Sequence, residues 1–118
     1  MRTRYEDIKS YTTKDGSSIK ELMHPDHQDV KNQSFAEAIV PVGIRTELHL
    51  HKKTEEIYFI TFGNGEMTLG DKTFRVSTGD TICISPNTPH CIFNCGSCEL
   101  KFICACSPAY SHEDTVLL

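Results

Sequence analysis

Signals for tight turns recur roughly every 8–12 residues along this chain, and this spacing limits the fold more than any other feature of the sequence. Two clear examples are Lys14-Asp15-Gly16-Ser17 and Gly70-Asp71-Lys72, which carry the glycine that a hairpin loop with positive φ requires. The segments between the turns are short, and they either alternate between apolar and polar residues or run apolar. Short strands at this spacing predict an all-β sandwich or barrel.

Length and charge narrow the class of protein. The chain has 118 residues, enough for a single domain over residues 1–118 with one hydrophobic core. Its net charge is −4 and it has no cluster of basic residues, which argues against nucleic acid and anionic membrane as partners. No apolar run is long enough to cross a bilayer, and residues 1–7 lack the apolar core of a signal peptide. We therefore expect a cytoplasmic protein.

The turn signals also set the expected boundaries of the strands. N-terminal strands are expected within residues 8–23, followed by a loop at 24–33, and residues 107–118 are expected to form a polar surface tail. Two short segments, 5–10 and 114–118, are compatible with helices. The remaining strands are predicted at 35–40, 44–51, 56–62, 67–69, 73–76, 81–84 and 100–106.

The segment Glu56–Phe62 is nearly continuous in apolar character, which is typical of a strand that is covered on both faces. One face is expected to line the inside of the barrel. The other face needs a cover, and a second copy of the chain is the natural candidate. The sequence therefore predicts a homodimer.

His49 and His51 lie two residues apart in the expected strand 44–51, so their side chains point to the same face. A lone histidine is more often a hydrogen-bonded residue than a metal ligand. Two histidines at this spacing, followed by Glu55 and Glu56, favour a divalent metal site, because a cation lets both rings stay neutral and uses their lone pairs. Both glutamates share a face with apolar residues, so the residues alone do not decide which of them is the ligand.

Strand parity predicts what else faces the inside of the barrel. Arg45 and Glu47 share the face of the paired histidines, so they either point inward or lie solvated at the rim. Tyr58 and Ile60 are expected to follow Glu56 inward. Tyr58 and Glu47 are therefore the candidate catalytic acid or base groups, with plain core packing as the alternative for Tyr58. Such a pocket suits a small polar or anionic ligand.

The six cysteines and the remaining histidines have simpler interpretations. In a reducing compartment, cysteines are more often small buried hydrophobes than disulfides. Cys95-Gly96-Ser97-Cys98 has the spacing of a zinc knuckle or redox pair. A thiolate zinc site needs a second such pair, and Cys104-Ala105-Cys106 has instead the spacing of a strand face. His24, His27 and His112 fall in predicted loops and are expected at the surface.

Two spaced motifs in the chain resemble those of the cupin family. The first is Gly43, five residues, His49-x-His51, four residues, Glu56, six residues and Gly63. The second runs from Gly79 to His90 and Asn94, with Ser85 and Asn87 in place of the usual proline and second glycine. Asparagine tolerates left-handed backbone geometry better than most residues, so the turn at Asn87 can be kept. The resemblance covers about residues 35–106 and implies an antiparallel jelly-roll barrel, the double-stranded β-helix of the cupins.

The resemblance also implies a site and a range of activities. It makes His49, His51, Glu56 and His90 the ligands of one divalent metal ion, for which Mn, Fe, Ni, Co and Zn are candidates. It implies a metalloenzyme of the dioxygenase, decarboxylase, lyase or isomerase type acting on a small oxygen-bearing molecule. The alternatives are a non-catalytic, metal-dependent binding module for a small carbohydrate-like ligand, and a protein whose metal only stabilises the fold. A phosphosugar site needs several basic residues around the pocket, whereas strand alternation places only one, Arg45, on the face of the paired histidines.

Overall fold

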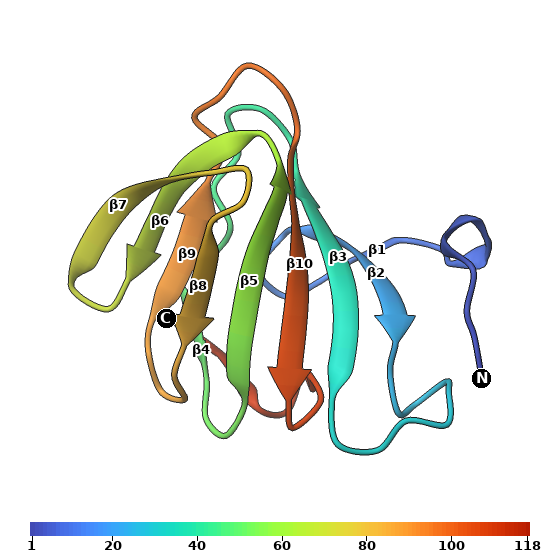
Figure 1. Ribbon diagram of the computed structural model, residues 1–118. Helices are drawn as coiled ribbons and strands as arrows, with labels where there is room; N and C mark the ends of the chain where they lie inside the picture. The colour runs from blue at the N-terminus through green and yellow to red at the C-terminus, as the bar shows by residue number, and fades with distance from the viewer.

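The computed structural model describes residues 1–118, and in it two antiparallel sheets pack face to face (Figure 1). The strands of the first sheet are, in spatial order, β1 (Tyr11–Thr12), β2 (Ser18–Met23), β3 (Ser34–Val40), β10 (Leu100–Ser107), β5 (Glu55–Phe62) and β8 (Thr81–Ile84). Those of the second sheet are β11 (Thr115–Leu117), β4 (His49–His51), β9 (His90–Phe93), β6 (Asn64–Leu69) and β7 (Lys72–Ser77).

Strands that are distant in sequence lie side by side in both sheets. β3 pairs with β10 and β4 pairs with β9, while the two predicted hairpins are confirmed as β1–β2 and β6–β7. This arrangement confirms the predicted antiparallel jelly roll. Of the two segments compatible with helices, residues 5–10 contain only a 3-10 turn, η1 (Tyr5–Asp7). No helix of the structure is both long enough and apolar enough to cross a membrane.

The core lies between the two sheets, because alternate residues of each strand point inward. On β10, for example, the side chains of Leu100, Phe102 and Cys104 are buried and those between them are only half-buried. Burying an aliphatic side chain stabilises a fold by about 1.5–3 kcal/mol. The layer that results fixes the strands that carry the histidines. Its largest fully buried aliphatic residues are Val40, Ile60, Met67, Ile84, Ile92 and Leu100.

The predicted strand that carries the paired histidines is regular only in its last three residues, β4. Alternation breaks before β4, because Thr46 and His49 are both buried although they lie three positions apart. The Thr46 hydroxyl accepts a hydrogen bond of 3.0 Å from the Ile92 amide, which holds Thr46 inward. Arg45 and Glu47 are consequently exposed. Of their two predicted positions, the solvated one is correct and the inward one is wrong.

Residues 107–118 are neither the surface tail nor, at 114–118, the short helix that the sequence suggested. Their last part forms β11, which pairs with β4 along its whole length. The Asp114 carboxylate accepts hydrogen bonds of 2.9 and 3.0 Å from the amides of Lys53 and Thr54. The sequence was misleading because β11 has only three residues, Thr-Val-Leu, which is too few for strand alternation to show after a polar stretch that contains a proline.

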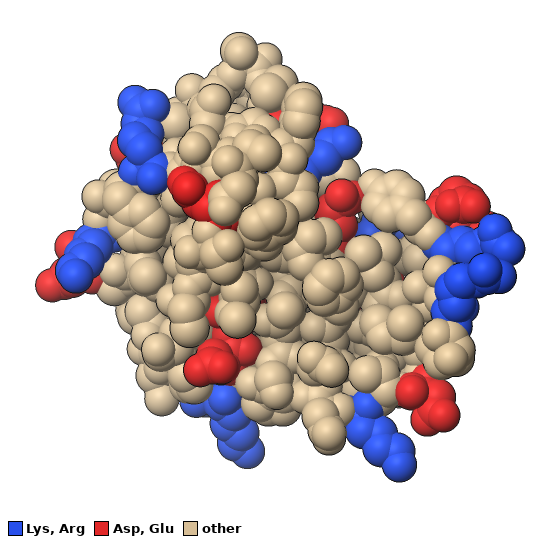
Figure 2. All heavy atoms as spheres, in the orientation of Figure 1, with Lys and Arg blue, Asp and Glu red and all other residues tan.

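The outward face of the six-stranded sheet is apolar and open. Phe35 on β3 and Ile57 and Phe59 on β5 point outward and are 45, 40 and 44 % exposed. Figure 2 shows few charged side chains over the middle of the molecule in this view, and most lysines and arginines lie at its margin. The expected two-sided cover of β5 is therefore absent within one chain, where only the inward face is buried.

Gly63, between β5 and β6, occupies a turn that only glycine fits. Its φ is +85°, and a Cβ there would lie 2.5 Å from the carbonyl oxygen of Glu99. Gly79 has a similar φ of +96°, but a Cβ there would meet nothing within 4 Å. We expect Gly63→Ala to lower the free energy of unfolding by about 3 kcal/mol or more and Gly79→Ala by about 1 kcal/mol, because only the first adds a clash to the strained backbone. Urea unfolding checks this, and equal losses would contradict it.

Candidate metal centre

Three histidines from two neighbouring strands meet inside the barrel. β4 supplies His49 and His51, and β9 supplies His90, which lies opposite His49 in the register of the strands. All three are buried, with exposed fractions of 3, 3 and 0 %. Their ring centroids are 5.1, 4.2 and 5.3 Å apart, and one ring nitrogen of each lies within 4.8 Å of the other two. The structure thus brings together the three histidines that the sequence singled out.

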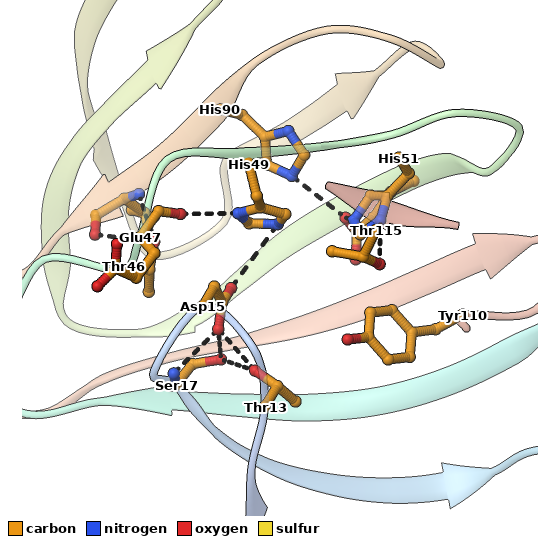
Figure 3. A network of polar contacts seen from close by, with 12 residues as sticks. Thr13, Asp15, Ser17, Thr46, Glu47, His49, His51, His90, Tyr110 and Thr115 are labelled. Carbon is orange, nitrogen blue, oxygen red and sulfur yellow. Dashed lines mark hydrogen bonds and ion pairs between the residues drawn. The ribbon is translucent and has the colours of Figure 1, made fainter. Parts of the chain in front are cut away.

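Hydrogen bonds at Nδ1 fix the orientation of the rings, and Figure 3 shows those of His49 and His51. The Nδ1 atom of His49 lies 2.8 Å from the carbonyl oxygen of Glu47, and that of His90 lies 2.9 Å from the carbonyl oxygen of Thr88. A carbonyl oxygen only accepts hydrogen bonds, so each Nδ1 carries a hydrogen and donates it. In the neutral rings, the lone pair is then on Nε2, which faces the centre of the cluster.

His51 is oriented by a side chain rather than by the backbone. Its Nδ1 atom lies 3.0 Å from the hydroxyl oxygen of Thr115, and that hydroxyl donates its own hydrogen to the Ser111 carbonyl at 2.8 Å. The hydroxyl oxygen must therefore accept a hydrogen from His51 Nδ1. This leaves the Nε2 lone pair of a neutral His51 facing inward, as in the other two rings.

Glu56 on β5 completes the cluster, whereas Glu55 points to the exposed face. The Oε1 atom of Glu56 lies 3.1 Å from His51 Nε2 and 3.6 Å from His90 Nε2. His90 Nε2 has no hydrogen-bond partner in the chain. When the rings are neutral, His51 Nε2, His90 Nε2 and Glu56 Oε1 therefore all direct lone pairs towards one another, with no hydrogen between them. A divalent cation removes that conflict. Ligand atoms about 2.1 Å from an ion and at right angles lie about 3.0 Å apart. The 3.1 Å between Glu56 Oε1 and His51 Nε2 fits such an ion.

Burial and neighbouring charge set the protonation of these groups. Burial lowers the pKa of His49 below its usual value, and the nearby ring of His90 lowers it further. Burial alone would raise the pKa of Glu56, but hydrogen bonds and positive charge from His51 and His90 in their protonated form outweigh burial and hold the pKa well below its usual range; when the rings are neutral, a bound cation takes over this role. A neutral imidazole beside an ionised carboxylate is the state in which both bind a divalent metal.

A cavity of about 40 Å³ lies beside the histidines, between the two sheets. Tyr58, Phe102 and Cys104 line it, and strand alternation predicted this position for Tyr58. Burial raises the pKa of Tyr58 well above its usual value, and the charge of Glu56 adds to the effect, so the phenol stays protonated. Glu47, the other candidate acid or base, is exposed and does not line the cavity.

Four further residues at this site were not found from the sequence. Cys106 donates from Sγ to Glu56 Oε2 at 3.2 Å, and its place on β10, in step with Phe102 and Cys104, was a usable signal. Thr115 and Tyr110 come from the segment interpreted as a surface tail, and Asp15 comes from a turn whose Asp-Gly pair already had a structural explanation. No local signal marked these three.

The other cysteines and histidines require two corrections. Cys83 and Cys95 are exposed, so the expectation of buried thiols holds only for the buried members of the set, Cys91, Cys104 and Cys106. His24 is not at the surface, since it is only 7 % exposed and its Nε2 lies 2.8 Å from the Tyr110 carbonyl oxygen. His27 and His112 are exposed, as expected. No cysteine belongs to the one group of side chains placed to hold an ion.

Comparison with known proteins agrees with this geometry. Residues 36–106 match the family described as "Cupin domain", which is more than half of the chain. The chain is a cupin. Over its full length this cupin is 54 % identical to an uncharacterized protein of Methanocaldococcus jannaschii, across 118 residues that make up 94 % of that protein. It is also 32 % identical over 84 residues to the oxalate-binding protein of Thermotoga maritima, across 71 % of this chain and 65 % of that protein.

Solved structures confirm the fold of this cupin. The nucleoside dehydratase Pac13 of Streptomyces matches it with a TM-score of 0.82 and 18 % identity, covering 100 % of this chain and 90 % of that one. A predicted oxalate decarboxylase of Thermotoga maritima matches with a TM-score of 0.80 and 24 % identity, covering 92 % of this chain and 99 % of that one.

The contact between His51 and Thr115 has a measurable consequence. We expect Thr115→Val to weaken the binding of a divalent ion about 10–100-fold, because His51 loses the acceptor that orients its ring. Thr115→Ser keeps the hydroxyl and is expected to bind like the wild type. Competition with a metal-binding dye measures both affinities. An unchanged affinity in the valine variant would show that Thr115 does not orient His51.

Proposed function

We propose that this cupin is a metal-dependent enzyme that binds one divalent ion through His49, His51, Glu56 and His90 and acts on a small oxygen-bearing substrate. Three imidazoles and one carboxylate leave positions open in an octahedral shell, which suits Mn²⁺, Fe²⁺, Ni²⁺, Co²⁺ or Zn²⁺. Such an ion supplies Lewis-acid or redox chemistry to an oxygen atom of the substrate.

The observation that carries this proposal is the Nε2 atom of His90, which is buried and has no partner. Leaving a buried polar atom unpaired costs about 1–3 kcal/mol. Native structures rarely keep such an atom without a ligand or a catalytic use for it. Here it faces the same point as the Nε2 atoms of His49 and His51, and Glu56 Oε1 lies close by.

The residues around the cavity have definite roles in this proposal. The protonated hydroxyl of Tyr58 donates a hydrogen bond to a substrate oxygen and does not act as a base at neutral pH. Phe102 packs against Tyr58 with ring centroids 4.5 Å apart and so limits the movement of its ring. Ala36 and Ala38 add apolar lining that excludes water from the site.

The visible absorption spectrum of the Co²⁺-loaded protein tests whether the bound ion is open to ligands. We expect the addition of acetohydroxamic acid to change the spectrum, because a small chelator takes the open positions. Protein treated with a chelator to remove the metal is the control, and it should show no cobalt band. A spectrum that no small ligand changes would identify a closed structural ion and would contradict the proposal.

One finding favours a second candidate, a non-catalytic module that binds a small carbohydrate-like or acid ligand at the same ion. The relative with 32 % identity is named an oxalate-binding protein. Turnover separates the two candidates. When small hydroxy acids and sugars are incubated with catalytic amounts of the metal-loaded protein, NMR spectra will show many equivalents of product per chain for an enzyme and unchanged ligand for a binding module.

We also propose that a second copy of the chain covers the outward face of the six-stranded sheet. The strand register places Phe35, Ala105, Ile57 and Cys83 in one row across four strands, with Phe59 in a neighbouring row. Exposed apolar patches of this kind mark interaction sites. Light scattering at micromolar concentration is expected to give twice the mass of one chain, and Ile57→Glu should give a monomer. A monomeric wild type would contradict this proposal.

A further inference from the structure

We propose that Asp15 selects the ligand of the metal centre, and that the ligand it selects is a neutral small molecule with a hydroxyl group rather than an anion. This inference rests on the proposed function, because it takes an ion at the histidine cluster as given. It adds a chemical class of ligand to that function and assigns the choice to one residue.

The carboxylate of Asp15 is held rigidly in the turn between β1 and β2. Its Oδ1 atom accepts three hydrogen bonds, from the hydroxyl of Thr13 at 2.6 Å and from the amide and hydroxyl of Ser17 at 2.9 and 2.6 Å. Three donors on one oxygen fix the plane of the group, and the side chain is only 13 % exposed. Figure 3 shows the carboxylate directed from the turn towards His49.

The second oxygen of this carboxylate faces the metal centre. Asp15 Oδ2 lies 3.8 Å from His49 Nε2, and none of the three hydrogen bonds of Asp15 involves it. His49 Nε2 is one of the atoms proposed to hold the ion, so a ligand bound beside it comes within reach of Oδ2. A carboxylate oxygen accepts hydrogen bonds and donates none. It therefore favours a ligand that brings a hydroxyl hydrogen and repels one that brings a negatively charged oxygen.

The charge of the cavity points in the same direction. Glu21 lines the cavity, and its Oε2 atom is buried without a hydrogen-bond partner, while no lysine or arginine is among the lining residues. Three carboxyl side chains, those of Asp15, Glu21 and Glu56, thus line the cavity. Sites for carboxylate or phosphate ligands supply arginine or lysine donors, which are missing here.

A groove of about 310 Å³ shares Glu21 and Tyr110 with the cavity. Asp26, Glu113 and three histidines also line this groove, again without lysine or arginine. The cavity itself, at about 40 Å³, holds roughly three water-sized groups. We infer that a ligand larger than a few atoms extends past Glu21 and Tyr110 into the groove, where it again meets hydrogen-bond acceptors. A neutral, hydroxyl-rich molecule matches both spaces.

Ligand titration of the Co²⁺-loaded protein tests this inference with two chelators of similar size. Glycolamide is neutral and keeps its hydroxyl hydrogen when its two oxygen atoms bind an ion, whereas oxalate is a dianion. The proteins are compared by the ratio of the dissociation constants for the two ligands, because oxalate is intrinsically the stronger chelator. Asp15→Asn keeps an oxygen for the Thr13 and Ser17 hydrogen bonds but removes the charge. It is expected to shift the ratio of the two dissociation constants about tenfold or more in favour of oxalate.

Asp71→Asn removes an equal charge from the exposed turn between β6 and β7, and it is the matched control with an expected wild-type ratio. The cobalt content of each protein is measured first by elemental analysis. Loaded Asp15→Asn with a wild-type ratio overturns this inference and leaves the proposed function standing. Loss of cobalt from Asp15→Asn alone makes Asp15 a ligand and also overturns it. A wild type that takes up no cobalt overturns both proposals.

Discussion

Purified protein in which His49 and His51 are both replaced by alanine is expected to contain almost no divalent metal, whereas the wild type contains close to one ion per chain. The double change removes two of the four proposed donors, and Glu56 and His90 alone do not form a stable site for a divalent ion. Both histidines are buried beside a cavity, so the substitutions add space rather than strain. Elemental analysis after gel filtration measures the metal content.

A matched control is available for this double variant. His27→Ala combined with His112→Ala removes two exposed histidines and should leave the metal content unchanged. Circular dichroism of both variants shows whether the β structure is intact. Wild-type metal content in a folded His49→Ala, His51→Ala protein would place the ion elsewhere in the chain.

Asn94→Ala is expected to lower the free energy of unfolding by about 3 kcal/mol or more. Asn94 is completely buried, and its Nδ2 atom donates to the carbonyls of Val40 and Cys98 at 2.8 and 2.9 Å. Its Oδ1 atom accepts a hydrogen bond of 3.0 Å from the Gly96 amide. Alanine leaves these three backbone groups without their partner, at about 1–3 kcal/mol for each one that stays buried. Urea unfolding measures the loss.

Asn32→Ala is the control for this substitution, because Asn32 is exposed and its side chain makes no such contacts. Its effect should stay within about 0.5 kcal/mol. If the two variants unfold at the same urea concentration, the network around Asn94 does not stabilise the fold in the way the structure indicates.

The fold and the centre of the site were predictable because both depend on local spacing. Asp-Gly and Gly-Asp signals mark tight turns, and they predicted the β1–β2 and β6–β7 hairpins correctly, although only the second loop has two residues. The interval between His49 and His51 places both rings on one face of a strand wherever that strand lies. His90 required more, since only the resemblance to cupins connected it with the earlier pair.

The residues that the sequence did not reveal reach the site through long-range contacts. Asp15 lies 34 positions before His49, and Thr115 lies 64 positions after His51. The alternation of residues along a single strand cannot predict that such distant positions come into contact. The inward position considered for Glu47 was wrong for a related reason. A hydrogen bond from the Ile92 amide to the Thr46 hydroxyl holds Thr46 inward, so inward and outward side chains do not alternate regularly before β4. Sequence patterns thus describe single strands well and describe poorly the turns and edges that other strands hold in place.

A crystal structure of the metal-loaded protein, measured at the absorption edge of the metal, tests the central claim most directly. The account predicts one anomalous difference peak per chain, about 2.0–2.2 Å from the Nε2 atoms of His49, His51 and His90 and from a carboxylate oxygen of Glu56. No peak at that point, or a peak at the thiols of Cys95 and Cys98 instead, would contradict it.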